Sequence, residues 1–100
     1  MRAYNVVRFR IKPGQEESFI AAHRFDPDFK GFRGGALVKT GELAYCFVGE
    51  WESFDDLAAA RGKMVGILDT FRDALEDQPG GLGKTDPVSG EAVVVFEPSK

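Results

Sequence analysis

A chain of 100 residues, 43% of them hydrophobic and 29% charged, has the composition of one soluble globular domain, which we assign to residues 1–100. The formal net charge is −3 and no stretch gathers Lys and Arg, which argues against a nucleic acid or a membrane surface as a partner. Nine phenylalanines are many for this length, so their rings must line a core, a pocket or an interface.

Cysteine usage and the first residues of the chain suggest a cytoplasmic protein. The single cysteine, Cys46, cannot form an internal disulfide, and its apolar neighbours are typical of a reduced, buried thiol. A nucleophilic role for Cys46 would need a nearby base that these neighbours do not provide. Arg8 and Arg10 interrupt the first apolar stretch, which therefore predicts neither a signal peptide nor a membrane span.

The first half of the chain reads as strand, helix and two strands. Apolar and polar residues alternate over Tyr4–Ile11, which predicts a strand. From about Gln15 the spacing becomes helical and places Phe19 and His23 on one apolar face, and Asp26-Pro27 should stop this helix.

Two strands should follow as a hairpin. Phe32–Lys39 contains the adjacent glycines 34 and 35, which suggest a bulge or a close approach of another group. Glu42–Trp51 is the longest apolar run and alternates like a strand that is buried on both faces.

The second half predicts a capped helix, a long loop and a last strand. Ser53 and Asp56 have capping-box spacing, and Gly62 is expected to kink or break the helix that they begin. An apolar stripe continues to Leu75. A loop over residues 78–90 should then lead to a final strand, Glu91–Phe96.

This order of elements predicts an α+β fold, a ferredoxin-like βαββαβ sandwich with a four-stranded antiparallel sheet. Two helices cover only one face of such a sheet, whereas the predicted strands are apolar on both faces. An uncovered apolar face of that size is rare in monomers, so we expect a homodimer in which two sheets pack face to face.

The sequence also resembles a known family. Residues 29–63, FKGFRGGALVKTGELAYCFVGEWESFDDLAAARGK, and the opening Val-x-Phe-x-Ile-Lys-Pro-Gly at residues 7–14 are similar to the antibiotic biosynthesis monooxygenase family of dimeric α/β barrels. The resemblance implies oxygenation of an electron-rich aromatic substrate without a metal or flavin cofactor, in a cavity between sheet and helices. Such folds also carry haem-degrading enzymes, isomerases and proteins without known activity, so fold alone does not decide the function.

His23 and Arg61 are the candidate catalytic residues. His23, the only histidine, lies on the apolar face of the first helix and has the pKa range of a general base for a phenolic proton; the alternative is a histidine that only packs in the core. Arg61 stands where many relatives place a histidine. A guanidinium there would neutralise an enolate or carboxylate, or would instead cap nearby carbonyls.

Three further residues are candidates for binding an aromatic small molecule. Asn5 and Tyr45 offer polar atoms, and Trp51 offers a ring to stack on and an indole N–H, although packing at the sheet edge is the favoured interpretation of Trp51. Alternation along the strands does not decide which sheet face meets the cavity.

Several other activities are disfavoured. The haem-degrading relatives have a Trp near the position of Leu57 and a later His, and both are absent from this chain. PGGLGKT at residues 79–85 lacks the first glycine and the preceding strand of a phosphate loop, and is better read as a lid or a plain surface loop. One His and one Cys cannot supply the spacing of a metal site. Three hypotheses remain open: a cofactor-independent oxygenase, a non-catalytic dimeric binding or stress-related protein, and a purely structural pairing module.

Overall fold

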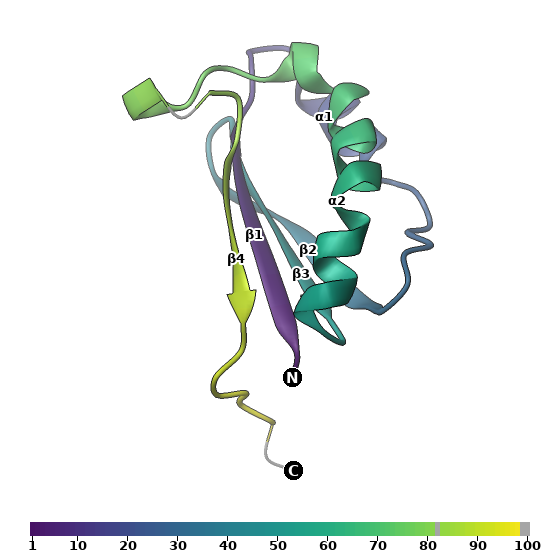
Figure 1. The fold of residues 1–100 in the computed structure, drawn as a ribbon. Helices are drawn as coiled ribbons and strands as arrows, with labels where there is room; N and C mark the ends of the chain where they lie inside the picture. Colours follow the sequence, from purple (N-terminus) through teal and green to yellow (C-terminus); the bar gives the residue numbers. More distant parts are fainter. Residues whose placement is uncertain (82, 99–100) are drawn as a thin grey trace.

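Four antiparallel strands and two helices form two layers (Figure 1). The structure is a computed structural model that describes residues 1–81 and 83–98. Its elements in chain order are β1 (Ala3–Arg10), α1 (Glu16–Ala22), β2 (Phe32–Gly41), β3 (Ala44–Trp51), α2 (Phe54–Asp69) and β4 (Asp86–Glu91), with short 3-10 turns at Arg72–Ala74 and Pro79–Gly81. The sheet order is β2-β3-β1-β4, and both helices lie on one side of it. The predicted α+β ferredoxin-like class is confirmed.

Local signals in the sequence explain several element boundaries. The Ser53 hydroxyl accepts a hydrogen bond from the Asp56 backbone N–H at 3.1 Å, which is the predicted cap of α2. The pairing of β2 with β3 shifts register between Phe32 and Gly34, where Gly34 has a φ of 144°, so the predicted bulge is also present. Helix α1 ends at Ala22, before the predicted stop at Asp26-Pro27.

The predicted break at Gly62 is wrong. Helix α2 runs without interruption from Phe54 to Asp69 and contains both Gly62 and Gly66. A glycine inside a helix costs only about 1 kcal/mol relative to alanine, and the alanines and leucine around Gly62 favour the helix enough to offset that.

The predicted final strand, Glu91–Phe96, is also misplaced. The strand that pairs with β1 is Asp86–Glu91, with Val88 opposite Val6 and Glu91 opposite Ala3. Because Ala3 is the first residue of β1, pairing ends there and the apolar residues that follow have no strand of this sheet beside them. Val93, Val94 and Phe96 are 87%, 65% and 90% exposed.

The register places each strand residue in a row that crosses the sheet. On the face under the helices, one row is Gly35, Gly49, Asn5 and Ser89, and the next is Leu37, Phe47, Val7 and Pro87. On the opposite face, which no helix covers within the described residues, the central row is Ala36, Val48, Val6 and Val88.

Two buried clusters separate along the helix-covered face. The larger contains Phe9, Phe19, Tyr45 and Phe71 under α1, and the smaller contains Ala3, Trp51, Leu57 and Ala60 under the start of α2. Within residues 1–81 and 83–98, no helix has both the length and the apolar character needed to cross a membrane.

Candidate functional site

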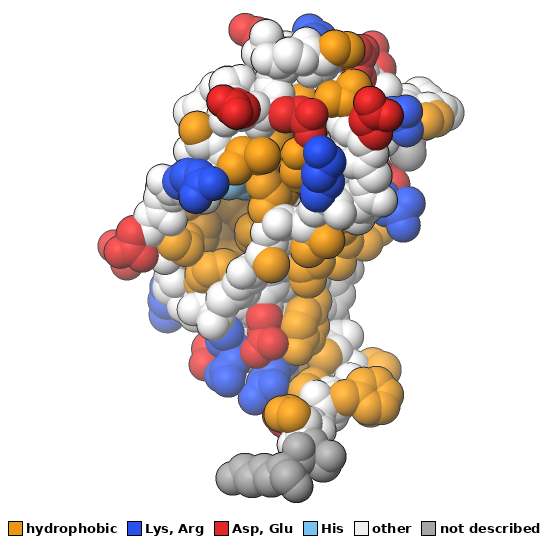
Figure 2. Space-filling view, turned by 180° about the vertical axis from the view of Figure 1, so that it is seen from behind, with side chains coloured by type: hydrophobic (Ala, Val, Ile, Leu, Met, Phe, Trp, Pro, Cys, Tyr) orange, Lys and Arg blue, Asp and Glu red, His pale blue; other side chains and the backbone are white. Residues whose placement is uncertain are grey.

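A cavity of about 580 Å³ lies between the two buried clusters, over the helix-covered face of the sheet. Figure 2 shows it as a hollow whose walls are mostly hydrophobic side chains. Its floor consists of the two rows that contain Asn5 and Val7, α2 forms one wall, and the chain between α1 and β2 contributes Phe25, Pro27 and Phe29. This volume and this apolar lining suit a small-molecule site.

The cavity exists because one row of its floor lacks large side chains. Gly35 and Gly49 lie side by side in that row, so the space above them is not filled by side chains of β2 and β3. A Cβ atom on Gly49 would lie 2.5 Å from Asn5 Oδ1, so this glycine also leaves room for the Asn5 amide. Of the two adjacent glycines of β2, Gly35 therefore forms part of the cavity floor, whereas Gly34 lies at the bulge.

Asn5 is the most deeply placed polar residue of the cavity, with an exposed fraction of 6%. Its Oδ1 accepts a hydrogen bond of 2.8 Å from Trp51 Nε1, which assigns the oxygen and nitrogen positions of the amide. Among the residues that the structure describes, its Nδ2 has only Met64 Sδ at 4.0 Å as a partner, and a thioether is a weak acceptor. The amide N–H groups are therefore available to a ligand oxygen.

His23 caps the C-terminal end of α1 and lines the cavity. Its Nδ1 lies 2.8 Å from the carbonyl oxygen of Phe19, and since a carbonyl only accepts, Nδ1 carries the proton of the neutral ring. The unprotonated Nε2 is then the basic atom. The ring lies among Phe9, Phe19 and Phe71, with centroid separations of 6.0, 4.6 and 4.7 Å.

These surroundings keep His23 neutral. Burial lowers the pKa of the imidazole below its ordinary 6.5, and the hydrogen bond to the Phe19 carbonyl opposes this shift only in part. Near pH 7 the side chain is thus an unprotonated base inside an apolar cavity, the state that a general base requires.

Arg61 lies at the cavity rim on α2. Its Nη2 donates a 3.0 Å hydrogen bond to the Ser89 hydroxyl on β4, and its Cζ lies 5.7 Å from the centre of the Phe54 ring. The guanidinium thus bridges the helix layer and the sheet edge beside the cavity, rather than capping carbonyls of its own helix.

Tyr45 does not line the cavity. It points to the helix-covered side but is buried under α1, where its hydroxyl donates a 2.6 Å hydrogen bond to Glu16 Oε2. Lys39 Nζ donates to the same oxygen at 3.0 Å. These two hydrogen bonds, that from Tyr45 first, lower the pKa of Glu16, so Tyr45 ties α1 to the sheet.

Trp51 both packs and borders the cavity. The side chain is fully buried, stacks on Phe29 with ring centroids 5.8 Å apart and meets Phe32 edge-on at 5.0 Å. The structure therefore brings four of the five predicted residues, Asn5, His23, Trp51 and Arg61, to one cavity.

Sequence reasoning missed other cavity residues. Met64, Thr85 and Ser89 contribute the remaining heteroatoms, and Phe25 and Phe29 come from a segment without secondary structure. Helical spacing from Leu57 would have found Met64, whereas nothing in the sequence marks Ser89. No group of three His, Cys, Asp or Glu side chains that could hold a metal ion occurs in the described part of the chain.

Comparisons with known proteins define the fold class. No family model matches the sequence, and no curated protein matches it. Solved structures do match over nearly the whole chain. One named as a putative antibiotic biosynthesis monooxygenase from Nitrosomonas europaea has a TM-score of 0.73 at 14% identity, covering 92% of this chain and 90% of its own. The chain therefore has the fold of proteins that carry the antibiotic biosynthesis monooxygenase name.

Two further matches carry different descriptions. SnoaB from Streptomyces nogalater, named as a cofactor-independent oxygenase, matches with a TM-score of 0.70 at 14% identity and covers 97% of this chain and 98% of its own. MhuD, solved as a point mutant with two manganese protoporphyrin IX molecules per active site, matches with a TM-score of 0.60 at 21% identity, covering 96% of this chain and 99% of its own. Proteins of different descriptions thus share this fold.

Proposed function

We propose that this protein is a cofactor-independent monooxygenase that oxidises a small aromatic, quinone-forming substrate in the cavity. The observation that carries this proposal is His23, a neutral imidazole whose Nδ1 is occupied by the Phe19 carbonyl and whose Nε2 is the available base in an apolar cavity of about 580 Å³. The fold shared with SnoaB, named as a cofactor-independent oxygenase, supports the same class of reaction.

The reaction that suits these residues begins with proton removal. Nε2 of His23 takes the proton of an acidic C–H or phenolic O–H, which leaves an electron-rich carbanion or phenolate. Molecular oxygen accepts electrons from this anion and forms a C–O bond at the activated carbon. Loss of water then completes the change of a CH₂ group and O₂ into a C=O group and H₂O, and His23 returns its proton to the departing oxygen.

Asn5 and Arg61 have binding roles in this proposal. The amide N–H groups of Asn5 donate to the substrate oxygen on which negative charge develops, and Trp51 holds the amide in that orientation. Arg61 adds positive charge at the rim, where it attracts an enolate or phenolate.

We further propose that the protein is a cytoplasmic homodimer. The open sheet face carries the row Ala36, Val48, Val6 and Val88, in which Val88 is 62% exposed, and Val38 beside this row is 44% exposed. Packing this row against the same row of a second copy would remove it from water. The single, unpaired Cys46 on this face suits a reducing compartment.

Replacing His23 with Gln tests the proposal. Oxygen consumption with anthrone or a hydroquinone should fall by about 10²-fold or more in His23→Gln, because positioned general bases contribute about 10² to 10⁴. Arg24→Gln is the matched control, since Arg24 is the exposed neighbour and does not line the cavity. Trp51 borders the cavity, so its fluorescence reports ligand binding in each variant. Turnover that persists unchanged in His23→Gln would remove the proposed base.

A non-catalytic binding protein is the second candidate. It is favoured by the way the polar groups of the cavity are already paired, Asn5 Oδ1 with Trp51 and Arg61 with Ser89. Under this alternative, Trp51 fluorescence would report tight binding of an aromatic ligand while neither the wild-type protein nor any variant consumes oxygen.

A further inference from the structure

A buried amide of the cavity is paired with a sulfur atom instead of an oxygen. Within the described part of the chain, the partner of Asn5 Nδ2 is Met64 Sδ, at 4.0 Å, although the Asn5 side chain is almost fully buried. Buried amide N–H groups normally donate to an oxygen, because it is costly to leave such a donor unpaired. A thioether is a weak acceptor, so this contact leaves the Asn5 donors nearly unsatisfied.

Met64 faces the cavity from α2. It follows Leu57 and Ala60 on the same face of the helix, and these two residues are buried in the smaller cluster, whereas Met64 is only partly buried beside it. Met64 and Asn5 both line the cavity, which is open to the surface as the hollow in Figure 2. A small solute that enters this hollow can therefore reach the sulfur.

The amide of Asn5 is held in one orientation. Its Oδ1 accepts the hydrogen bond from Trp51 Nε1 at 2.8 Å, and the Trp51 ring is fully buried against Phe29 and Phe32. Because an indole N–H only donates, the amide oxygen stays on the side of Trp51 and Nδ2 stays on the side of Met64. The direction of the donor is thus fixed before a ligand binds.

Oxidation of the thioether would change what Nδ2 faces. Hydrogen peroxide converts a methionine to its sulfoxide. A lone pair of sulfur attacks one peroxide oxygen, an S–O bond forms as the O–O bond breaks, and the second oxygen leaves as water with both protons. Sulfur loses two electrons and the peroxide gains them. The product is a polar acceptor where the thioether was apolar.

The distance between the two side chains suits this added oxygen. Sδ and Nδ2 are too far apart for a strong hydrogen bond, but their 4.0 Å separation leaves room for one oxygen atom between them. With that oxygen bonded to sulfur and directed at the amide, its distance from Nδ2 would be about 2.7 to 3.2 Å, the usual range of an N–H···O hydrogen bond. The flexible methionine side chain can adopt this orientation.

We propose that Met64 is a site of oxidation by hydrogen peroxide, and that its sulfoxide oxygen accepts a hydrogen bond from Asn5 Nδ2 and so closes this donor to ligands. The effect on binding rests on the function proposed above, in which the same N–H groups hold the substrate oxygen. The oxidation and its effect on Asn5 do not depend on the oxygenase reaction.

Peroxide treatment of a Cys46→Ser protein tests the site. In this background Met1 and Met64 carry the only sulfur atoms of the chain. Peptide mass spectrometry should find one added oxygen on Met64, and the assigned side-chain amide signals of Asn5 in an NMR spectrum should shift, with an unchanged circular dichroism spectrum. Oxidation of Met1 alone, unshifted Asn5 signals or loss of the circular dichroism spectrum would each overturn the proposal.

Met64→Leu in the same background is the matched control. Leucine keeps a similar apolar volume and has no sulfur, so peroxide can then act only on the sulfur of Met1, which is 71% exposed. The Asn5 signals of this variant should be the same before and after treatment. A shift that persists in Met64→Leu would refute Met64 as the site.

Binding of 2-naphthol separates this proposal from the proposed function. In calorimetry the dissociation constant of the Cys46→Ser protein should rise about tenfold after peroxide treatment, because the phenol oxygen must displace the sulfoxide from the Asn5 amide. Met64→Gln, which also offers an oxygen acceptor, should bind about as weakly without peroxide. Equal dissociation constants before and after treatment would refute the closure of the donor. If the untreated protein bound no 2-naphthol, the proposed function would fail, and the Asn5 signals would still decide whether the sulfoxide pairs with the amide.

Discussion

The two faces of the sheet are formed by the same four strands but differ in the size of their side chains. On the helix-covered face, the row Gly35, Gly49, Asn5 and Ser89 is small and polar, and a cavity opens above it. One position along each strand, the opposite face carries Ala36, Val48, Val6 and Val88, a continuous apolar row. Side-chain size in one row therefore distinguishes the face with the cavity from the continuous apolar face.

The largest expected effect is on the helix-covered face. Trp51→Ala should lower the free energy of unfolding by about 3 to 5 kcal/mol, because it removes the largest side chain of the smaller buried cluster and leaves Asn5 Oδ1 without its donor. Phe25→Ala, at the cavity rim and 44% exposed, should lower it by about 1 kcal/mol or less. Urea unfolding of both variants measures the difference, and similar losses would mean that Trp51 does not anchor this cluster.

Alanine at Gly49 and alanine at Gly66 should change the free energy of unfolding in opposite directions. Gly49→Ala puts a Cβ atom 2.5 Å from Asn5 Oδ1 and 3.2 Å from Trp51 Nε1, so the free energy of unfolding should fall by about 1 to 3 kcal/mol and ligand-induced changes in Trp51 fluorescence should weaken. Gly66→Ala, inside α2 with nothing within 4 Å, should raise the unfolding free energy by about 0.5 to 1 kcal/mol. A stabilising Gly49→Ala would contradict the proposed fit between Gly49 and Asn5.

A smaller effect is expected for His23 on the way the free energy of unfolding changes with pH. Since burial lowers the pKa of His23 below 6.5, the unfolded chain binds a proton at this residue more readily than the folded chain. The stability that comes from neutral His23 is therefore present above about pH 6.5 and is lost as the pH falls through the lower pKa of the folded state. Unfolding measured between pH 5 and 8 should show this loss in the wild-type protein and in Arg24→Gln, but not in His23→Gln. If the wild-type stability changed with pH in parallel with that of His23→Gln, folding would not remove His23 from water.

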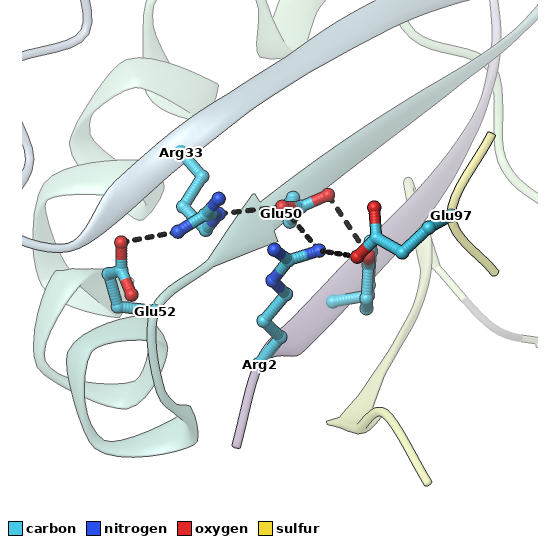
Figure 3. Close-up of polar contacts among 6 residues, drawn as sticks. Arg2, Arg33, Glu50, Glu52 and Glu97 are labelled. Carbon is cyan, nitrogen blue, oxygen red and sulfur yellow. Dashed lines mark hydrogen bonds and ion pairs between the residues drawn. The ribbon is translucent and has the colours of Figure 1, made fainter. Parts of the chain in front are cut away.

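The smallest effect is expected on the open face. Glu52 is 58% exposed and pairs with Arg33 at 2.6 Å, and such exposed ion pairs contribute little because water screens them. Glu52→Gln should leave the urea midpoint within experimental scatter, at low and at high salt. A clear, salt-sensitive drop would show that the network in Figure 3 stabilises the fold more than its exposure suggests.

Most of the fold could be predicted from the sequence because alternation and capping act locally. The strand at the N-terminus, the bulge in β2 and the Ser53 cap each depend on a few neighbouring residues. The last strand could not be placed in this way. Residues 91–96 have a stronger strand pattern than residues 86–91. However, Val6 of β1 pairs with Val88, and the register along the whole of β1 decides which residues form the last strand.

The candidate site was predictable in part for the same reason. Alternation along β3 puts Tyr45 and Trp51 on one face, and the structure agrees, with both buried on the helix side. Alternation along β3 does not predict where along the strand each helix crosses. Tyr45 lies under α1 and Trp51 at the cavity, a difference that depends on tertiary packing. The row of Gly35, Gly49, Asn5 and Ser89, above which the cavity lies, likewise appears only when the four strands are aligned.

The most direct test of the central claim is a crystal structure of the protein with an unreactive phenol such as 2-naphthol, whose O–H can donate a hydrogen bond to the unprotonated Nε2 of His23. We predict that the ligand lies over the row of Gly49 and Asn5, with one ligand oxygen within about 3.2 Å of His23 Nε2. An empty cavity, or a ligand whose oxygen contacts neither His23 nor Asn5, would contradict the assignment of this cavity as the active site.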